Sequence, residues 1–188
     1  MYKRMNRKKI LNVGCGSDTY GTHFIDLYPT RKEVLKCNVD TDKFPFPDNY
    51  FDEVYAKYLF EHLRNPMHFL SECYRVLKRG GKIIIITDNA NYWVWAVNRT
   101  HLGEYEERSQ KNEDRHYALF TPHHLRNHLE IAGFKEIRTG YLPLKSEDFK
   151  SANLKHLKYL VCLLAYLILK HTPFWRMAYP RVYAEARK

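Results

Sequence analysis

The chain has 188 residues and a formal net charge of +10, from 31 Lys and Arg against 21 Asp and Glu. This length suits one domain with a sizeable core, and 45% hydrophobic residues is ordinary for a soluble globular protein. The four cysteines lie far apart and lack the spacing of a zinc site, so we expect free thiols in a reducing cytoplasm.

The positive charge favours anionic partners such as nucleic acid, phosphorylated metabolites or an acidic membrane surface. No separate nucleic-acid-binding motif accompanies it, so nucleic acid stays an unsupported alternative. Residues 1–8 form a polar, basic segment that predicts a solvated tail and no signal peptide. We expect a single domain over residues 1–188, located in the cytoplasm.

Short apolar runs bounded by Gly or Pro predict the first strands of a buried sheet. Gly14-Cys15-Gly16 stops the first apolar run. Two prolines within residues 44–49 exclude regular structure just before the fourth run, at residues 51–58. The predicted strands lie at residues 9–13, 23–27, 33–39 and 51–58.

A helix and a central strand follow. Asn65 with Pro66 is typical of a helix start, and Gly80-Gly81 predicts the end of that helix. Residues 82–87 (KIIIIT) are apolar on both faces, as in a central parallel strand, and such a sheet requires helices on both of its faces.

The last third alternates loop, helix and strand. Residues 91–117 predict a long loop over the sheet. Thr121 with Pro122 starts a helix that Gly133 ends. Strands are predicted at residues 134–142 and 181–187. Residues 152–170 predict an apolar helix, whose run at 159–169 is shorter than the ~20 residues of a membrane span. We expect this helix to be buried in the core or in a homodimer interface, with an acceptor cover or a peripheral membrane contact as alternatives.

Two features at strand ends indicate a nucleoside site. Glycine at 14 and 16 lets a ligand approach the backbone closely, and Asp26 ends the second strand, where a carboxylate can accept both ribose hydroxyls. A strand-ending Asp that caps a turn is an equal alternative. Thr19 stands where the dinucleotide pattern needs Gly, which counts against NAD.

Four segments in order resemble the class I S-adenosylmethionine-dependent methyltransferases, specifically the small type 11 group: LNVGCG (11–16), FIDLYP (24–29), FPFPDNYFDEVYAKYLFEHL (44–63) and ECYRVLKRGGKIIIITDN (72–89). The resemblance covers about residues 9–142. It implies a doubly wound, mostly parallel, Rossmann-like α/β sheet with an antiparallel last strand. Only residues 17–22 separate the first two strands, so the first crossover is shortened.

The resemblance also implies a cofactor, S-adenosylmethionine, and residues that contact it. Either Asn38 or Asp40 would meet the adenine amino group, and Lys57 would act through its backbone. The predicted cofactor-binding residues are Val13, Gly14, Cys15, Gly16, Asp26, Leu27, Asn38, Val39, Asp40 and Lys57.

Acceptor-site and catalytic candidates follow the fourth and fifth strands. His62, Tyr58 and Asp88 are the catalytic candidates, and Trp93 and Trp95 could wall off the methyl group or lie in the core. Methyl transfer requires no metal in principle. His124 and His128 share a helix face without a completing carboxylate or cysteine, so no metal site is predicted.

The methyl acceptor is of unknown class. A small molecule or a lipid- or glycan-linked acceptor is our first hypothesis. An RNA or protein methyltransferase, and a nucleoside-binding protein without activity, are the alternatives.

Overall fold

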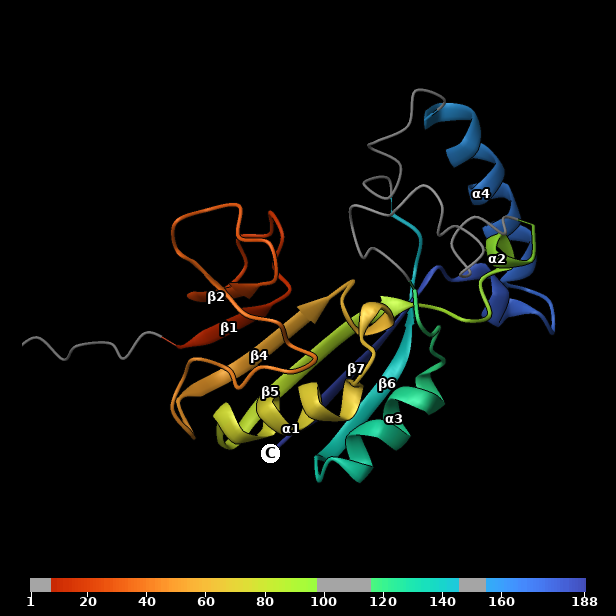
Figure 1. Cartoon of the computed structure of the whole chain (residues 1–188). Coiled ribbons are helices and arrows are strands. Elements are labelled where there is room, and N and C mark those ends of the chain that lie inside the picture. Colours follow the sequence, from red (N-terminus) through yellow and green to blue (C-terminus); the bar gives the residue numbers. More distant parts are fainter. Residues whose placement is uncertain (1–7, 98–115, 146–154) are drawn as a thin grey trace, which may run out of the picture.

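The computed structural model describes residues 8–97, 116–145 and 155–188 and contains one sheet of seven strands in the order β3-β2-β1-β4-β5-β7-β6 (Figure 1). Strands β1 to β5 pair in parallel, and β7 runs antiparallel to both β5 and β6. The predicted fold class is therefore confirmed. The strands are β1 (Ile10–Val13), β2 (His23–Asp26), β3 (Val34–Lys36), β4 (Phe51–Lys57), β5 (Leu77–Asp88), β6 (Lys135–Leu142) and β7 (Arg181–Arg187).

Two helices, α1 (Pro66–Val76) and α3 (Pro122–Ile131), lie against the same face of the sheet (Figure 1). Both begin as expected, because the Asn65 side chain accepts the His68 N–H and the Thr121 side chain accepts the His124 N–H. Burial alternates across the sheet: Val54, Ile83 and Ala186 share one register and are fully buried or nearly so.

The expectation of helices on both faces is not met within the described residues. The next register, Tyr55, Ile84 and Glu185, is only half-buried, and none of the described helices packs over it. The cause is the length of the early connections. The segments between β1 and β2 and between β3 and β4 contain turns and loops only, so the crossover helices of a longer chain have no counterpart there.

The predicted end of α1 at Gly80-Gly81 is wrong. The helix stops at Val76, and Leu77 already pairs with Phe51 as the first residue of β5. The pairing register then shifts, so Gly80 and Gly81 lie in an irregular start of that strand. Gly80 has φ +73°, and a Cβ at Gly81 would lie 2.8 Å from the Lys78 carbonyl oxygen. The glycine pair is therefore required by the strand and not by a helix cap.

Two of the quoted motifs interlock through one arginine. Arg75 on α1 donates to the Phe44 and Phe46 carbonyl oxygens at 3.0 and 2.9 Å, and to Asp48 at 2.7 Å. Its neighbour Glu72 accepts the Phe44 N–H at 2.7 Å and pairs with Arg75 at 2.6 Å. The proline-rich loop is thus held to α1 although its backbone forms no regular structure.

Two short segments differ from the predicted loop and tail. A helix, α2 (Trp93–Val97), begins inside the predicted loop 91–117, and residues 98–115 lie outside the described part. Of the predicted basic tail 1–8, only Lys8 is described, and its ammonium pairs with the buried Glu53 at 2.7 Å. Lys8 is therefore part of the fold, because a buried carboxylate is costly without a partner.

Helix α4 (Lys155–Leu169) is the expected apolar helix; it is not buried in the core of this chain, and its burial in a homodimer interface stays a prediction. Leu160, Leu164, Leu167 and Ile168 are between 44% and 67% exposed. The helix stands beyond the upper end of the sheet and not within it (Figure 1). Within the described residues, no helix has the length and apolarity needed to cross a membrane.

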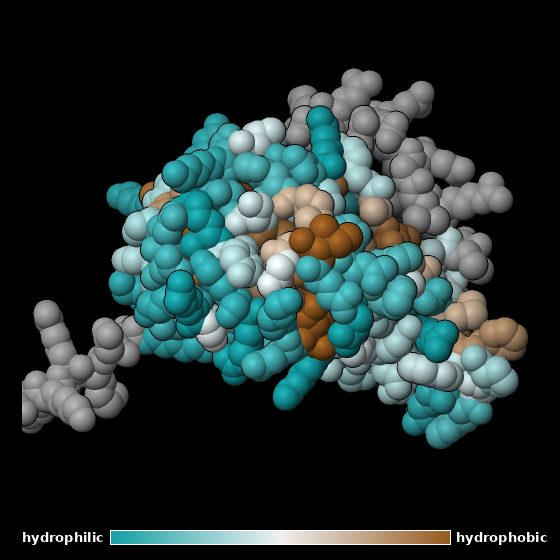
Figure 2. All heavy atoms as spheres, turned by 90° about the horizontal axis from the view of Figure 1, so that it is seen from below, coloured by the Kyte–Doolittle hydropathy of each residue, from teal (hydrophilic) through white to brown (hydrophobic). Residues whose placement is uncertain are grey.

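All four cysteines are buried and unpaired, which confirms free thiols. Figure 2, seen from below toward the amino ends of β4 and β5, shows a mostly hydrophilic surface with few hydrophobic side chains near its centre. A ligand site has to be sought elsewhere, at the opposite end of the strands, where ligands of open α/β sheets bind.

Candidate functional site

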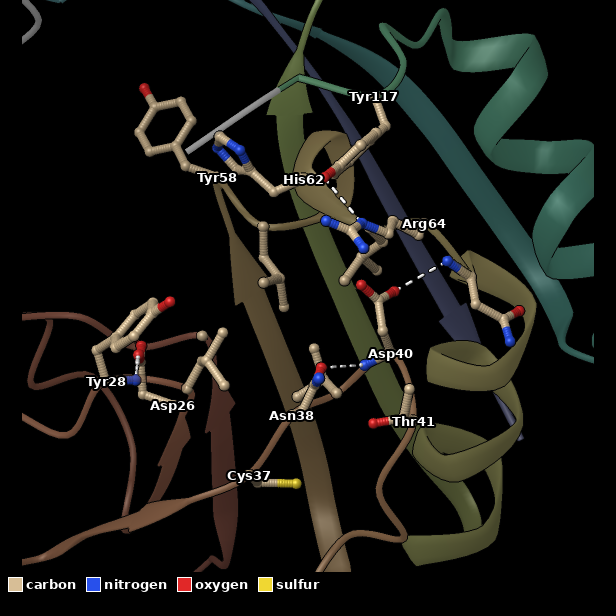
Figure 3. A pocket seen from close by; sticks show the side chains of 16 residues that line it. Asp26, Tyr28, Cys37, Asn38, Asp40, Thr41, Tyr58, His62, Arg64 and Tyr117 are labelled. Carbon is tan, nitrogen blue, oxygen red and sulfur yellow. Dashed lines mark hydrogen bonds between the residues drawn. The ribbon is translucent and has the colours of Figure 1, made fainter. Parts of the chain in front are cut away.

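A cavity of about 640 Å³ opens at the carboxyl ends of β1, β2 and β4 (Figure 3). This volume is within the ~300–1,000 Å³ typical of small-molecule sites. Eight predicted site residues line the cavity: Gly14, Asp26, Leu27, Asn38, Val39, Asp40, Tyr58 and His62.

The glycine turn after β1 forms one wall. Gly14 has φ +63°, and its N–H donates to the Ile25 carbonyl oxygen at 2.9 Å, which ties the turn to β2. A Cβ built on Gly14 would lie 2.7 Å from Cδ1 of Leu59. Gly16 also has positive φ, +48°, but a Cβ there would meet nothing within 4 Å. Only Gly14 is therefore required by a close approach.

Asp26 is held rigidly at the cavity edge. One carboxylate oxygen accepts the Gly16 N–H and the other accepts the Tyr28 N–H, each at 2.8 Å. The carboxylate thus joins the glycine turn to the end of β2 and still lines the cavity. The two interpretations of Asp26, a turn cap and a ligand contact, are compatible in one geometry.

Asn38 and Asp40 lie on the opposite wall and contact each other (Figure 3). The Asn38 side-chain oxygen accepts the Asp40 N–H at 3.1 Å. One Asp40 carboxylate oxygen accepts the Asn65 N–H at 2.9 Å, which fixes Asp40 to the start of α1. Asp40 keeps a second carboxylate oxygen, whereas the only oxygen of the Asn38 amide already accepts one N–H.

Tyr58 and His62 lie where the cavity approaches β5. Tyr58 follows β4 with φ +54°, and the nearly buried Arg181 of β7 donates to its hydroxyl at 3.1 Å. His62 belongs to a 3-10 turn, η1 (Phe60–His62). Lys57 does not line the cavity, and its ammonium lies 5.2 Å from the centre of the Tyr58 ring.

Asp88, the third catalytic candidate, ends β5 and lies behind this region without lining the cavity. Burial raises the pKa of Asp88 to about 7, and the negative charge of Glu61 adds to the effect, against the opposing charges of His62 and Arg181. A carboxyl with a pKa near neutrality can exchange protons at physiological pH.

The remaining cofactor candidates fall outside the cavity lining. Val13 is fully buried in the core, Cys15 is 4% exposed, and Gly16 contributes only its N–H to Asp26. Trp95 likewise does not line the cavity, and its indole N–H donates to the Asn89 carbonyl oxygen at 2.9 Å.

The cavity also has lining residues that the sequence interpretation did not include: Tyr28, Cys37, Thr41, Leu59, Leu63, Arg64, Asn65 and Tyr117. Most of them adjoin predicted residues or lie in the quoted FPFPDN…EHL block, so the motif itself was the available signal. Tyr117 is different. Its hydroxyl accepts from Arg64 at 2.8 Å across 53 residues of sequence, a contact that no local pattern indicates.

This chain is similar to methyltransferases in part of its sequence and in its fold. A domain family described as "Methyltransferase domain" matches residues 23–85. A solved SAM-dependent methyltransferase from Archaeoglobus fulgidus matches 96% of this chain and 86% of its own length, with a TM-score of 0.61 at 18% identity.

Curated relatives are similar over shorter stretches. An uncharacterized protein of Methanocaldococcus jannaschii is 34% identical over 110 residues, 57% of this chain and 49% of that protein. The ubiquinone/menaquinone biosynthesis C-methyltransferase UbiE of Chromobacterium violaceum is 43% identical over 47 residues, 25% of this chain and 19% of UbiE. The matched part of this chain thus spans half or less of each curated relative.

The sheet order and the structural match give this chain the Rossmann-like fold of class I S-adenosylmethionine-dependent methyltransferases, with a cavity at the ends of β1 and β2. The methyltransferase-domain match at residues 23–85 falls within the part of the chain whose motifs predict the type 11 group.

Proposed function

We propose that this protein transfers a methyl group from S-adenosylmethionine, bound in the cavity beside Gly14 and Asp26, to an acceptor at the Tyr58–His62 end. The observation that carries the proposal is the Asp26 carboxylate, fixed by two N–H groups at 2.8 Å beside a turn that has no room for a Cβ. S-adenosylmethionine, when bound, supplies a methyl group on a positively charged sulfur with a neutral leaving group.

The residues present fit such a ligand. Gly14 admits the backbone side of the ligand, and Asp26 accepts from ribose hydroxyls. Leu59 and Leu63 supply apolar walls that exclude water near the reacting end. Methyl transfer depends mainly on the alignment of the acceptor with the methyl group. Such positioning lowers the activation barrier by roughly 7–11 kcal/mol in well-oriented systems. His62, which lines the cavity beside Tyr58, is a side chain that would contact the acceptor.

Of the two adenine candidates, Asp40 is the stronger. The adenine amino group donates hydrogen bonds, and Asp40 retains a second carboxylate oxygen that can accept one. Asp40→Asn keeps an oxygen for the Asn65 N–H but converts the other position into a donor. The variant should therefore lose preference for adenosine over inosine, measured by calorimetry. An unchanged preference would assign the amino-group contact to Asn38.

Calorimetry with S-adenosylmethionine and NAD tests the cofactor. We expect S-adenosylmethionine to bind more tightly, and Asp26→Ala to weaken it at least about tenfold, or roughly 1.4 kcal/mol. Asp18→Ala is a matched control, because Asp18 also accepts a backbone N–H at 2.8 Å in the neighbouring loop but does not line the cavity. Tighter binding of NAD, or equal affinities of the two variants, would overturn the assignment.

The acceptor class needs its own experiment. Methyl-tritiated S-adenosylmethionine and fractionated cell extract should place label in the small-molecule or lipid fraction under our first hypothesis. Label in RNA or protein would favour the alternative acceptors suggested by the +10 charge. Absence of label, with cofactor binding intact, would favour a nucleoside-binding protein without activity.

A lipid-linked acceptor is favoured by one specific observation. The exposed side chains Leu160, Leu164, Leu167 and Ile168 recur at helical spacing on α4, and the exposed Phe174 follows that helix. Such a stripe beside basic residues such as Lys170 and Arg176 suits an interfacial contact with an anionic membrane. Leu164→Glu should reduce sedimentation with anionic vesicles, with Leu35→Glu, an exposed leucine on β3, as the control. Equal sedimentation of both variants would contradict this contact.

A further inference from the structure

A group of potential metal ligands lies at the acceptor end of the cavity, where the sequence predicted no metal site. Glu61, His62 and His116 each place one ligand atom so that all three atoms lie within 4.8 Å of one another. Glu61 is buried and His62 lines the cavity, so the group bridges the protein interior and the open site. The two histidine rings are 4.6 Å apart between centres.

The fold brings the three residues together from distant segments. The Glu61 carbonyl oxygen accepts the N–H groups of Tyr117 and Ala118 at 2.8 and 3.4 Å. These bonds hold the segment that begins at His116 against η1, and the hydrogen bond from Arg64 to the Tyr117 hydroxyl adds a side-chain link. The His116 position is therefore determined by backbone pairing and not by a surface rotamer.

The surroundings orient the ligand groups. One carboxylate oxygen of Glu61 accepts the Thr87 hydroxyl at 2.6 Å, which orients the carboxylate. Asp88 lies 3.8 Å from Nδ1 of His116. A carboxylate next to a ligating histidine is the usual outer partner that sets the tautomer and ring orientation of that histidine.

We propose that Glu61, His62 and His116 bind one divalent transition-metal ion at the acceptor end of the cavity. Two imidazoles and one carboxylate form the donor set of catalytic zinc and of non-haem iron sites, with open positions for an outside ligand. Mg²⁺ and Ca²⁺ prefer oxygen ligands and fit the set poorly. Ligands about 2.0–2.1 Å from an ion lie roughly 3.4 Å apart in a tetrahedron, so binding draws the three side chains inward by small rotations.

An ion in this place has a consequence for the acceptor, which rests on the proposed function. Because His62 lines the cavity, an open coordination position there faces the space beside the cofactor site. In catalytic zinc sites water or substrate fills the open position, so we infer an acceptor with a hydroxyl or carboxylate oxygen near the methylated atom.

Zinc calorimetry and cobalt absorption on the EDTA-dialysed full chain test the ion site. Wild type should bind one equivalent of Zn²⁺, and Co²⁺ should give a visible band that Zn²⁺ displaces. Glu61→Gln, which keeps an oxygen for Thr87, and His116→Gln should each weaken binding at least about tenfold, roughly 1.4 kcal/mol. The control is His128→Gln, because His128 packs on Phe60 and Phe120 outside the group.

Absence of binding to wild type, or binding that persists in both Glu61→Gln and His116→Gln, overturns the proposal. Circular dichroism checks that the variants fold. If Glu61→Gln does not fold, His116→Gln still tests the site, because His116 is partly exposed. The outcome is separable from the proposed function. Asp26→Ala should lose S-adenosylmethionine binding and keep zinc, whereas His116→Gln should lose zinc and keep S-adenosylmethionine.

Discussion

Replacing Gly14 with alanine gives a quantitative test of the turn beside the cavity. Two costs add at this position. A left-handed φ of +63° costs an L-residue about 1–2 kcal/mol, and a Cβ at 2.7 Å from Leu59 Cδ1 adds an overpacking cost of about 1–3 kcal/mol. We therefore expect Gly14→Ala to lower the free energy of unfolding by about 2–5 kcal/mol.

The chain supplies a matched control two residues away. Gly16 also has positive φ, but its Cβ would meet nothing within 4 Å, so Gly16→Ala should cost only the backbone term, about 1–2 kcal/mol. Urea unfolding followed by circular dichroism measures both variants. The difference of about 1–3 kcal/mol between them belongs to the contact with Leu59.

A double-mutant cycle then isolates that contact. In a Leu59→Ala background, the extra cost of Gly14→Ala should disappear, because the colliding methyl group is gone. Leu59 also lines the cavity, so Gly14→Ala alone should push its side chain inward and weaken S-adenosylmethionine binding. Equal destabilisation by Gly14→Ala and Gly16→Ala, or no rescue by Leu59→Ala, would refute this account of the turn.

Two further predictions concern the ion pairs of the buried carboxylates Glu72 and Glu53. Arg75→Ala leaves the carboxylate of Glu72 without its partner and should cost about 3–5 kcal/mol in urea unfolding. Arg79→Ala, at an exposed position, should change stability by less than about 0.5 kcal/mol, and similar losses for the two would contradict the interlock. Burial alone would raise the pKa of the Glu53 carboxyl. Hydrogen bonds from Lys8 and Tyr20 outweigh this effect and hold the pKa below its ordinary value of 4.5. Its contribution is therefore present above pH 4.5 and is lost as pH falls through the lower folded pKa, so the stability gap between wild type and Glu53→Gln should close in acid. A gap that stays constant from pH 7 to pH 3 would contradict this ionic role.

Most strands could be predicted because each is a local pattern. The run that ends at Gly14 and the run that ends at Asp26 are apolar segments stopped by a turn, and both occur as β1 and β2. The residues at the ends of β1 and β2 also support the cofactor prediction, because the carboxyl ends of parallel strands lie at the same edge of the sheet. The site residues found from sequence are those that follow a strand directly.

The errors arise where a distant partner decides the conformation. Gly80-Gly81 is a good helix stop in isolation, yet pairing with β4 extends the strand back to Leu77. The apolar run of α4 predicted burial in the core or in a homodimer interface; its exposed side chains exclude the core of this chain, and the interface stays a prediction. Cysteine burial, by contrast, follows from residue type and agreed with the expectation of free thiols.

Glu61 shows how one long-range residue organises the acceptor end of the site. The sequence predicted no role for Glu61. In the structure it is 1% exposed, its carboxylate accepts from Thr87 on β5, and its carbonyl oxygen accepts from the segment that begins at His116. Glu61 therefore ties η1 to β5 and to the segment around Tyr117 at the acceptor end, and the zinc titration tests whether its carboxylate also binds a cation.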